Sequence, residues 1–271
     1  MKAFVIIILF VLPALIAIGQ NIPYGNNPAA GNYFNVGDAK LYYEIYGKGK
    51  PIVLLHGGVY GYIDEFTPFI NRLSEKYQVI CIATRGHGKS EIGQGDITYA
   101  QRAEDAYKVI RHITSDSVMV LGFSDGAYSG LKLAALHPET VKKLIAIGCG
   151  DFPKDHPKKF DYNPEGLMKY DSAFFTKRLA LMPEPNRWRE YLAKLTKLYN
   201  DDYVSSETFS QIKNPTLIMC GDRDQYITME AVVKCARSIQ NARLSVIPGC
   251  SHVVFFCNFP AVWEAIRPFL E

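Results

Sequence analysis

The sequence predicts an α/β domain with a mostly parallel, doubly wound sheet, and two observations lead to this prediction. Short apolar runs alternate with helical patterns along the chain, and most of the runs end close to a glycine. Runs that are apolar on both faces suit strands buried between layers of helices. Strands that alternate with helices are typical of a parallel sheet. The length of 271 residues fits one such domain with an insertion, which we favour, as well as it fits two domains.

The first two strands are expected at residues 33–36 and 40–46, around a Gly-Asp turn that indicates a hairpin. This hairpin would add antiparallel strands at one edge of the sheet. A capping box of Thr98 with Gln101 marks the start of a helix over residues 98–113. Further strands are expected at residues 51–55, 78–83, 117–121, 144–147, 216–219 and 243–247, and further helices at residues 127–136, 229–239 and 261–270.

One stretch, residues 151–210, breaks the alternation because it contains no strand-like run. Its length is far beyond that of an ordinary loop. Helical patterns over residues 172–181 and 186–199 follow a start that is rich in Pro and Lys. We therefore expect a helical cap at about residues 151–210, inserted in a domain that spans residues 20–271. The cap would cover the carboxyl edge of the sheet, where open α/β sheets bind ligands.

The N-terminus is typical of a secretory signal peptide. Lys2 precedes an unbroken apolar run over residues 3–18, which ends on the sequence Ala-Ile-Gly. We expect residues 1–19 to be cleaved off after Gly19, which predicts a secreted or periplasmic protein with no stable membrane insertion. The apolar run is short for a membrane span, and an uncleaved anchor is the alternative.

The composition is that of an ordinary globular protein, with 48% hydrophobic and 21% charged residues. A formal net charge of +3, spread evenly along the chain, argues against a nucleic-acid partner. The six cysteines show no metal-ligand spacing, and we expect no metal and no organic cofactor. In an exported protein cysteines can form disulfides. Cys220 and Cys250 are one candidate pair, because both lie at loops expected to converge on one site. Nothing in the sequence indicates an oligomeric state.

The central chemical signal is the segment Gly122-Phe123-Ser124-Asp125-Gly126, which follows an expected strand and precedes an expected helix. This is the setting of a nucleophile elbow, in which a sharp turn exposes the serine at the edge of the sheet. The glycines allow the tight turn without side-chain clashes. The alternative is an ordinary strand-to-helix turn. We favour the elbow, with Ser124 as nucleophile, because candidate partners follow later in the chain.

A serine hydroxyl is a weak nucleophile until a base takes its proton. His252 is the candidate base, because it lies in the loop between the last expected strand and the last helix. Asp222 and Asp224 follow the preceding strand, and either could orient the imidazole. We favour Asp224 because it lies deeper in its loop, where its side chain can turn toward the histidine. The order serine, aspartate, histidine is the one that accompanies a nucleophile elbow.

The negative oxygen that forms during acyl transfer needs two preorganised N–H donors. One is expected from Asp125, the residue after the nucleophile. The other is expected from the loop His56-Gly57-Gly58, with Gly58 as the donor. Two backbone amides on two different loops would then complete the oxyanion hole.

These motifs resemble the α/β-hydrolase superfamily over nearly the whole length that follows residue 19. The matching segments are residues 56–58, 85–90, 122–126, 221–224 and 249–252. The resemblance implies an α/β-hydrolase fold with an inserted helical cap, and a serine hydrolase that acts on a carboxylic ester. It also favours Asp224, since the family places its acid third after that glycine. Ala127 stands where the family often has a second glycine, and the cap does not match residue by residue.

The elbow is also similar to that of valacyclovir hydrolase-like proteins. This similarity implies that Asp125 holds the ammonium group of an amino-acid ester. The alternative is that Asp125 only stabilises the start of a helix, where acidic residues are favourable.

We therefore predict hydrolysis of an ester-like bond in a small molecule through an acyl-enzyme. Aromatic residues of the cap, Phe174, Phe175 and Trp188, are expected to wall the substrate pocket. Lactonase, thioesterase and aminopeptidase activities use the same triad and stay open as alternatives. A non-catalytic ligand-binding protein on a hydrolase scaffold is a further alternative. Such proteins usually lose a member of the triad, and all three are present here.

Overall fold

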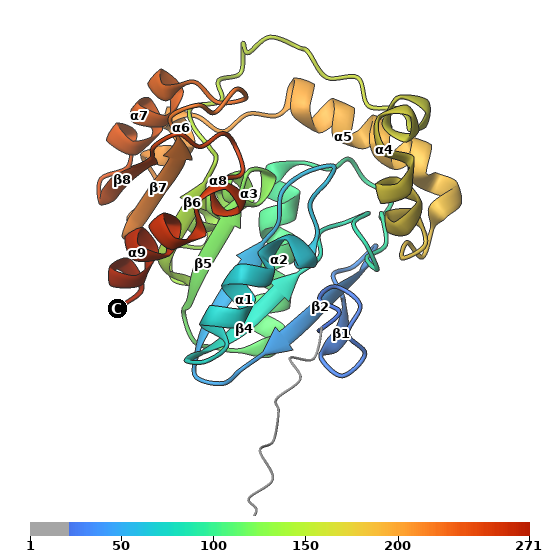
Figure 1. Cartoon of the computed structure of the whole chain (residues 1–271), viewed down its shortest axis with the longest axis horizontal. Coiled ribbons are helices and arrows are strands. Elements are labelled where there is room, and N and C mark those ends of the chain that lie inside the picture. Colours follow the sequence, from blue (N-terminus) through green and yellow to red (C-terminus); the bar gives the residue numbers. More distant parts are fainter. Residues whose placement is uncertain (1–21) are drawn as a thin grey trace, which may run out of the picture.

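An eight-stranded sheet forms the centre of the computed structural model, which describes residues 22–271 (Figure 1). Its strands are β1 (Gly31–Asn35), β2 (Lys40–Tyr46), β3 (Lys50–Leu55), β4 (Tyr77–Ile82), β5 (Val118–Phe123), β6 (Val141–Ile147), β7 (Thr216–Gly221) and β8 (Ala242–Ile247). They are ordered β1-β2-β4-β3-β5-β6-β7-β8. The pairs β1–β2 and β2–β4 are antiparallel, and all the other pairs are parallel. The carboxyl ends of six strands therefore meet at one edge.

Helices cover both faces of the sheet. They are α1 (Thr67–Leu73), α2 (Tyr99–Ile113), α3 (Asp125–Leu136), α4 (Pro164–Leu179), α5 (Trp188–Asp201), α6 (Ser206–Phe209), α7 (Met229–Ser238), α8 (Val254–Cys257) and α9 (Phe259–Leu270), with 3₁₀ turns η1 (Ile63–Phe66) and η2 (Pro185–Arg187). Side chains of α2, α3 and α7 share one hydrophobic core with the sheet. Side chains of α1, α8 and α9 share the core on the other face. The central strands are buried on both sides, which explains their unbroken apolar runs.

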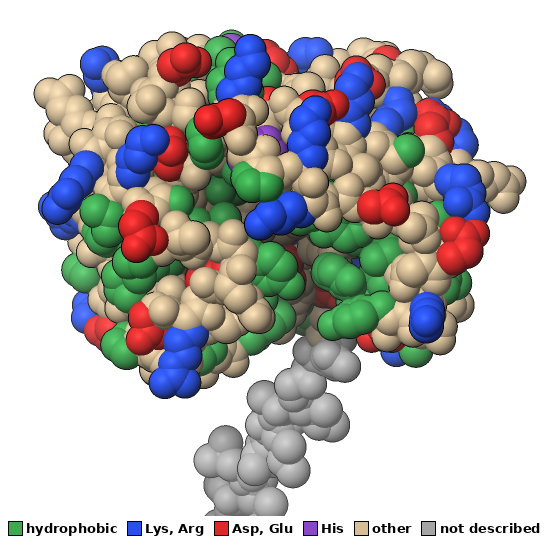
Figure 2. Space-filling model, turned by 90° about the horizontal axis from the view of Figure 1, so that it is seen from above, with side chains coloured by type: hydrophobic (Ala, Val, Ile, Leu, Met, Phe, Trp, Pro, Cys, Tyr) green, Lys and Arg blue, Asp and Glu red, His purple; other side chains and the backbone are tan. Residues whose placement is uncertain are grey.

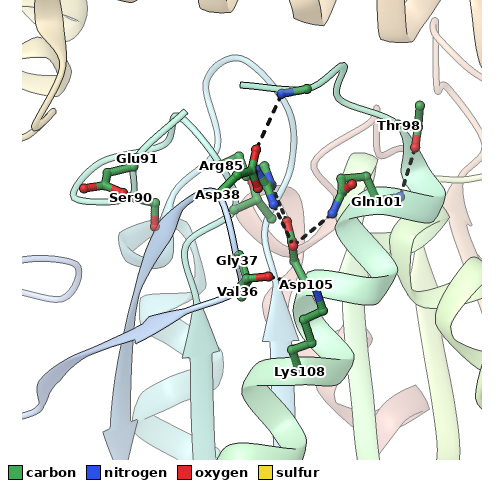
Figure 3. A network of polar contacts seen from close by, with 12 residues as sticks. Val36, Gly37, Asp38, Arg85, Ser90, Glu91, Thr98, Gln101, Asp105 and Lys108 are labelled. Atoms are coloured by element: carbon green, nitrogen blue, oxygen red, sulfur yellow. Dashed lines mark hydrogen bonds and ion pairs between the residues drawn. The ribbon is translucent and has the colours of Figure 1, made fainter. Parts of the chain in front are cut away.

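The predicted fold class is confirmed, including the antiparallel hairpin at one edge. The sequence analysis missed α1, which is short and lies between two strands that pair with each other. The capping box forms only in part. Thr98 accepts the N–H of Gln101 at 2.9 Å, but the Gln101 side chain donates to Asp105 instead of returning to Thr98 (Figure 3).

Asp105 belongs to a network centred on Arg85, which is 4% exposed (Figure 3). The guanidinium contacts both oxygens of Asp105, with Nε at 2.6 Å and Nη2 at 3.0 Å. Its third nitrogen lies 2.8 Å from Asp38 in the β1–β2 turn. Asp38 in turn accepts the N–H of Gln94 at 2.9 Å. The network therefore ties the loop after β4 to α2 and to the edge hairpin.

The segment between β6 and β7 contains α4, η2, α5 and α6. An isolated bridge between Phe152 and Val204 closes its base. Figure 1 shows α4 and α5 above the edge toward which the parallel strands point. α4 begins earlier than the predicted helix, and it is interrupted at Asp171, whose φ of −152° and ψ of 84° are not helical. α5 buries the apolar stripe that the sequence predicted.

The predicted signal peptide, residues 1–19, lies outside the described residues. From residue 22 to residue 271, no helix combines the length and the apolar character needed to cross a membrane.

We predict that Asp105→Asn destabilises the protein by about 3 kcal/mol, because it leaves the buried Arg85 without its principal counter-charge. Asp38→Asn is the matched control and should cost less than about 1 kcal/mol, since the Asp38 side chain is 41% exposed. Urea unfolding of the two variants measures both values. Equal losses in the two variants would contradict this account of the network.

Candidate active site

Ser124 lies in the turn between β5 and α3, with φ of 52° and ψ of −115°. It is the one non-glycine residue with positive φ in the described part of the chain. The flanking glycines make this turn possible. A Cβ on Gly122 would lie 2.2 Å from the carbonyl oxygen of Gly126, and one on Gly126 would lie 1.8 Å from that of Leu55. No larger residue fits either position, so the motif follows from close backbone packing.

Three side chains from three loops meet at this turn. His252 Nε2 lies 3.0 Å from Ser124 Oγ, and His252 Nδ1 lies 2.8 Å from Asp224 Oδ2. Ser124 follows β5, Asp224 follows β7, and His252 follows β8. The structure therefore brings all three predicted residues together in one hydrogen-bonded chain. With the proton on Nδ1, the ring donates to the carboxylate and accepts from the serine hydroxyl.

The structure places Asp224, and not Asp222, against the histidine. Asp224 Oδ1 accepts the N–H groups of Tyr226 and Ile227, and its side chain is 1% exposed. Burial acts to raise the pKa of Asp224, but the His252 ring and the two amides outweigh it and hold the pKa below its ordinary value. The carboxylate is thus ionised at neutral pH. Asp222 instead accepts the N–H of Gly249 and fixes the turn after β8.

The imidazole of His252 is held on several sides. The Phe123 ring lies 5.1 Å from it and the Tyr226 ring 5.0 Å, between ring centroids. Gly148 has φ of 68°, and a Cβ at this position would lie 3.0 Å from His252 Cε1. These contacts restrict the ring to the orientation in which each nitrogen meets its partner.

A disulfide joins Cys250 to Cys257 and spans the segment that contains His252. The interpretation of Cys220 and Cys250 as a pair is therefore wrong. Cys220 is a free thiol, buried at the end of β7. Its apolar strand places it inside the core, whereas Cys257 ends the short helix α8 and approaches Cys250 from the same loop.

In the loop after β3 the backbone N–H of Gly57 is already engaged, so Gly58 stays the candidate oxyanion donor. The N–H of Gly57 donates to Glu65 Oε1 at 2.6 Å. His56 bonds the backbone on both sides, with Nδ1 at 2.7 Å from the Gly57 oxygen and Nε2 accepting from Thr84 N at 3.0 Å. Burial lowers the pKa of His56 to about 3, so its ring is neutral and structural. Glu65 is a site residue that the sequence analysis missed, since it lies within an otherwise unremarkable 3₁₀ turn.

Asp125 is already paired inside the protein, which argues against its predicted contact with a substrate ammonium group. Its Oδ2 accepts from Arg102 Nη1 at 2.6 Å and from the Tyr199 hydroxyl at 2.6 Å. Asp125 is 5% exposed and Arg102 2% exposed. Another cation would have to displace a buried guanidinium, which leaves an unpaired charge. Arg102 lies in the first turn of α2, and no motif in the sequence marks it as a partner of Asp125.

Aromatic residues gather near the triad at the carboxyl edge. Tyr60, which follows the Gly58 loop, packs against Phe174 and Phe175 of α4 at 5.9 and 5.3 Å between ring centroids. Trp188 packs behind Phe175 at 5.8 Å, and its predicted contact with substrate stays a prediction. Tyr60 and Tyr226 are exposed. Figure 2 views the molecule from above relative to Figure 1. In this view the surface is hollowed near its centre, and hydrophobic side chains gather around the hollow.

Within residues 22–271, no group of three or more His, Cys, Asp or Glu side chains is arranged to hold a metal ion.

Comparisons with known proteins agree with this fold. A sequence profile of the family described as alpha/beta hydrolase fold matches residues 50–187. A non-heme haloperoxidase of Rhodococcus erythropolis is 28% identical over 271 residues, which covers 86% of this chain and 96% of that protein. The 2-hydroxy-6-oxo-6-(2'-aminophenyl)hexa-2,4-dienoic acid hydrolase of Metapseudomonas resinovorans is 26% identical over 244 residues, or 81% and 83% of the two chains. An esterase structure from Exiguobacterium antarcticum superposes with a TM-score of 0.71 at 25% identity and covers 88% and 98% of the two chains.

We predict that Glu65 makes folding stability depend on pH. Burial raises the pKa of Glu65 from its ordinary value of 4.5 to about 8. The folded state therefore holds this proton more tightly than the unfolded state does, and stability is lost as the pH rises from about 4.5 through about 8. Glu65→Gln imitates the protonated form and keeps an acceptor for Gly57. At pH 8.5 its thermal midpoint should exceed that of the wild type by roughly 3 °C or more.

At pH 5 the two midpoints should lie close together, because wild-type Glu65 is protonated in the folded state there. Glu75→Gln, at an exposed glutamate, controls for the loss of one negative charge. A difference between Glu65→Gln and the wild type that is the same at pH 5 and pH 8.5 would refute the role of this carboxyl.

Proposed function

Because the chain belongs to the alpha/beta hydrolase fold family, we propose that it is a serine hydrolase that cleaves a carboxylic ester of a small molecule. The observation that carries the proposal is the unbroken chain of contacts from Ser124 Oγ through the His252 ring to Asp224. An imidazole between a hydroxyl and a buried carboxylate can take the hydroxyl proton and hold it. The esterase of Exiguobacterium antarcticum supports an ester as the substrate.

The reaction proceeds in two halves. Ser124 Oγ attacks the ester carbonyl carbon while His252 Nε2 takes its proton, and Asp224 stabilises the imidazolium that forms. The amides of Gly58 and Asp125 donate to the oxyanion. The histidine then protonates the departing alkoxide, which leaves an acyl group on Ser124. A water molecule attacks this acyl-enzyme, with His252 again acting as the base, and releases the acid.

The surroundings of the triad favour an ester with a flat, apolar group. Tyr226 is 69% exposed and lies against the catalytic imidazole, and Tyr60 is 45% exposed on the neighbouring loop. Aromatic faces bind planar groups by stacking or edge contacts. The name of the Metapseudomonas resinovorans relative includes an aminophenyl group, which fits this choice. A substrate ammonium group is not part of the proposal, because Arg102 neutralises Asp125.

Export of the protein is part of the same proposal. The predicted signal peptide supports it, and so does the disulfide between Cys250 and Cys257. Disulfides persist in the periplasm and outside the cell, whereas cytosolic thiols are kept reduced.

A fluorophosphonate probe should label the wild-type protein stoichiometrically, and Ser124→Ala should abolish labelling, because only an activated serine reacts with the probe. Ser129→Ala is a matched control, since Ser129 lies on α3 and its hydroxyl is bonded to the Asp125 carbonyl. Gel fluorescence and intact mass spectrometry measure the outcome. If the folded wild type takes no label, the hydrolase proposal fails and a non-catalytic binding protein becomes the favoured alternative.

Tyr226→Ala should raise KM for ethyl phenylacetate by about fivefold and leave KM for ethyl acetate within about twofold, since only the phenylacetate carries an aromatic ring that can stack on Tyr226. Steady-state kinetics on the two esters provides the comparison. The same change in KM for both esters would contradict an aromatic subsite at Tyr226.

A further inference from the structure

Two tyrosines interrupt the otherwise aliphatic buried stripe of α5. Tyr191 and Tyr199 are 3% and 7% exposed, and both rings point into the protein together with three leucines. A buried hydroxyl is unfavourable unless it finds a hydrogen-bond partner. The Tyr199 hydroxyl contacts the nucleophile elbow directly, and the Tyr191 hydroxyl contacts His87, which in turn reaches the loop after β3.

The first hydroxyl reaches the elbow itself. Tyr199 donates to Asp125 Oδ2 at 2.6 Å, on the same oxygen that Arg102 contacts. Burial raises the pKa of Tyr199 well above its ordinary value, and the phenol therefore stays protonated and able to donate. Asp125 is the first residue of α3, so a force on its side chain acts directly on the amide that would bind the oxyanion.

The same hydroxyl limits how closely the second loop can approach. A Cβ on Gly58 would lie 2.3 Å from Tyr199 Oη and 2.8 Å from Asp125 Oδ2. The backbone of Gly58 therefore rests on the pair formed by Tyr199 and Asp125. This contact explains why residue 58 is a glycine.

The second hydroxyl reaches Gly58 through a histidine. Tyr191 Oη lies 2.9 Å from His87 Nδ1 and 3.1 Å from His87 Nε2, and Nε2 lies 3.2 Å from the carbonyl oxygen of Gly58. His87 is 4% exposed, and burial together with the neighbouring His56 lowers its pKa, so the ring is neutral. With a proton on Nε2, the ring donates to Gly58 and accepts from Tyr191.

We propose that Tyr199 and Tyr191 are positioning residues through which helix α5 fixes the two oxyanion donors, Asp125 and Gly58, relative to each other. The proposal rests on the hydrolase function above and adds a role for the inserted segment. Without the Tyr199 hydroxyl, Asp125 keeps its ion pair with Arg102, but the surface on which Gly58 rests loses an atom. The backbone amides of Asp125 and Gly58 would then no longer point at the same oxygen, on which the negative charge develops.

Tyr199→Phe tests this proposal, because it removes one oxygen and no other part of the ring. For hydrolysis of p-nitrophenyl acetate, kcat should fall about tenfold while KM stays within about twofold. This loss is smaller than that caused by deletion of a whole oxyanion donor. Tyr191→Phe, which acts through His87, should lower kcat about threefold. The inhibition constant of phenylboronic acid, which forms a tetrahedral adduct on the serine, should rise by the same factors.

Two measurements separate positioning from a general structural defect. Inhibition by the product p-nitrophenol, which has no acyl oxygen to place in the oxyanion hole, should be unchanged in both variants. Tyr107→Phe is the matched control. Tyr107 lies on α2 and packs on His137. Its hydroxyl makes no hydrogen bond within the described chain, so removal of this hydroxyl should change no kinetic constant. Thermal unfolding shows whether each variant is folded. If Tyr199→Phe does not fold, Tyr191→Phe tests the proposal by itself.

The proposal is overturned if kcat and boronate inhibition match the wild type in the folded variants. It is also overturned if KM and the inhibition constant of the product both rise while kcat is retained. The tyrosines would then only shape the pocket. A wild type that neither hydrolyses esters nor takes the fluorophosphonate label would instead refute the hydrolase function. The two failures are therefore distinguishable.

Discussion

The left-handed backbone of Ser124 is the constraint on which the site depends. A non-glycine residue at φ of 52° is strained, and the surrounding chain must hold it there. Steric packing keeps Ser124 in this conformation, because Gly126 lies so close to the end of β3 that a Cβ would overlap the Leu55 carbonyl. The same packing brings the loop after β3 beside the start of α3. The position of Ser124 and the proximity of the two proposed oxyanion donors thus follow from one backbone contact.

Charge inside the site is arranged so that every buried ion has a partner. The Asp125 carboxylate is matched by Arg102, and the Asp224 carboxylate by two amides and the His252 ring. Where no partner is available, the group is neutral. Burial keeps the rings of His56 and His87 uncharged, and it raises the pKa of Glu65 to about 8. None of these buried groups is left to offset the negative charge that would develop on a substrate, and in the proposed mechanism the fixed amide dipoles meet that charge.

The sequence predicted those features that follow from chain order and sheet topology. Parallel strands bring their carboxyl ends to one edge, so Ser124, Asp224 and His252 could be expected to meet although they lie far apart in the chain. Partners that come from helices carry no such signal. Arg102 lies within an ordinary amphipathic pattern, and the stripe of α5 predicts that Tyr199 is buried but not what its hydroxyl contacts. The Cys250–Cys257 disulfide was missed for a similar reason, because pairing depends on a turn of α8 that the apolar sequence does not reveal.

The two main helices of the inserted segment, α4 and α5, differ in how tightly they pack and in which part of the site they contact. α4 is interrupted at Asp171, buries few of its side chains, and meets the site through the aromatic rings of Phe174 and Phe175. α5 is regular, buries a full stripe and is bonded to the elbow at Tyr199. Because a loosely packed helix tolerates substitution better than one bonded to a buried carboxylate, we expect changes in α4 to alter the proposed pocket without moving the proposed oxyanion donors. In the proposed mechanism, this architecture separates the choice of substrate from the geometry of the reaction.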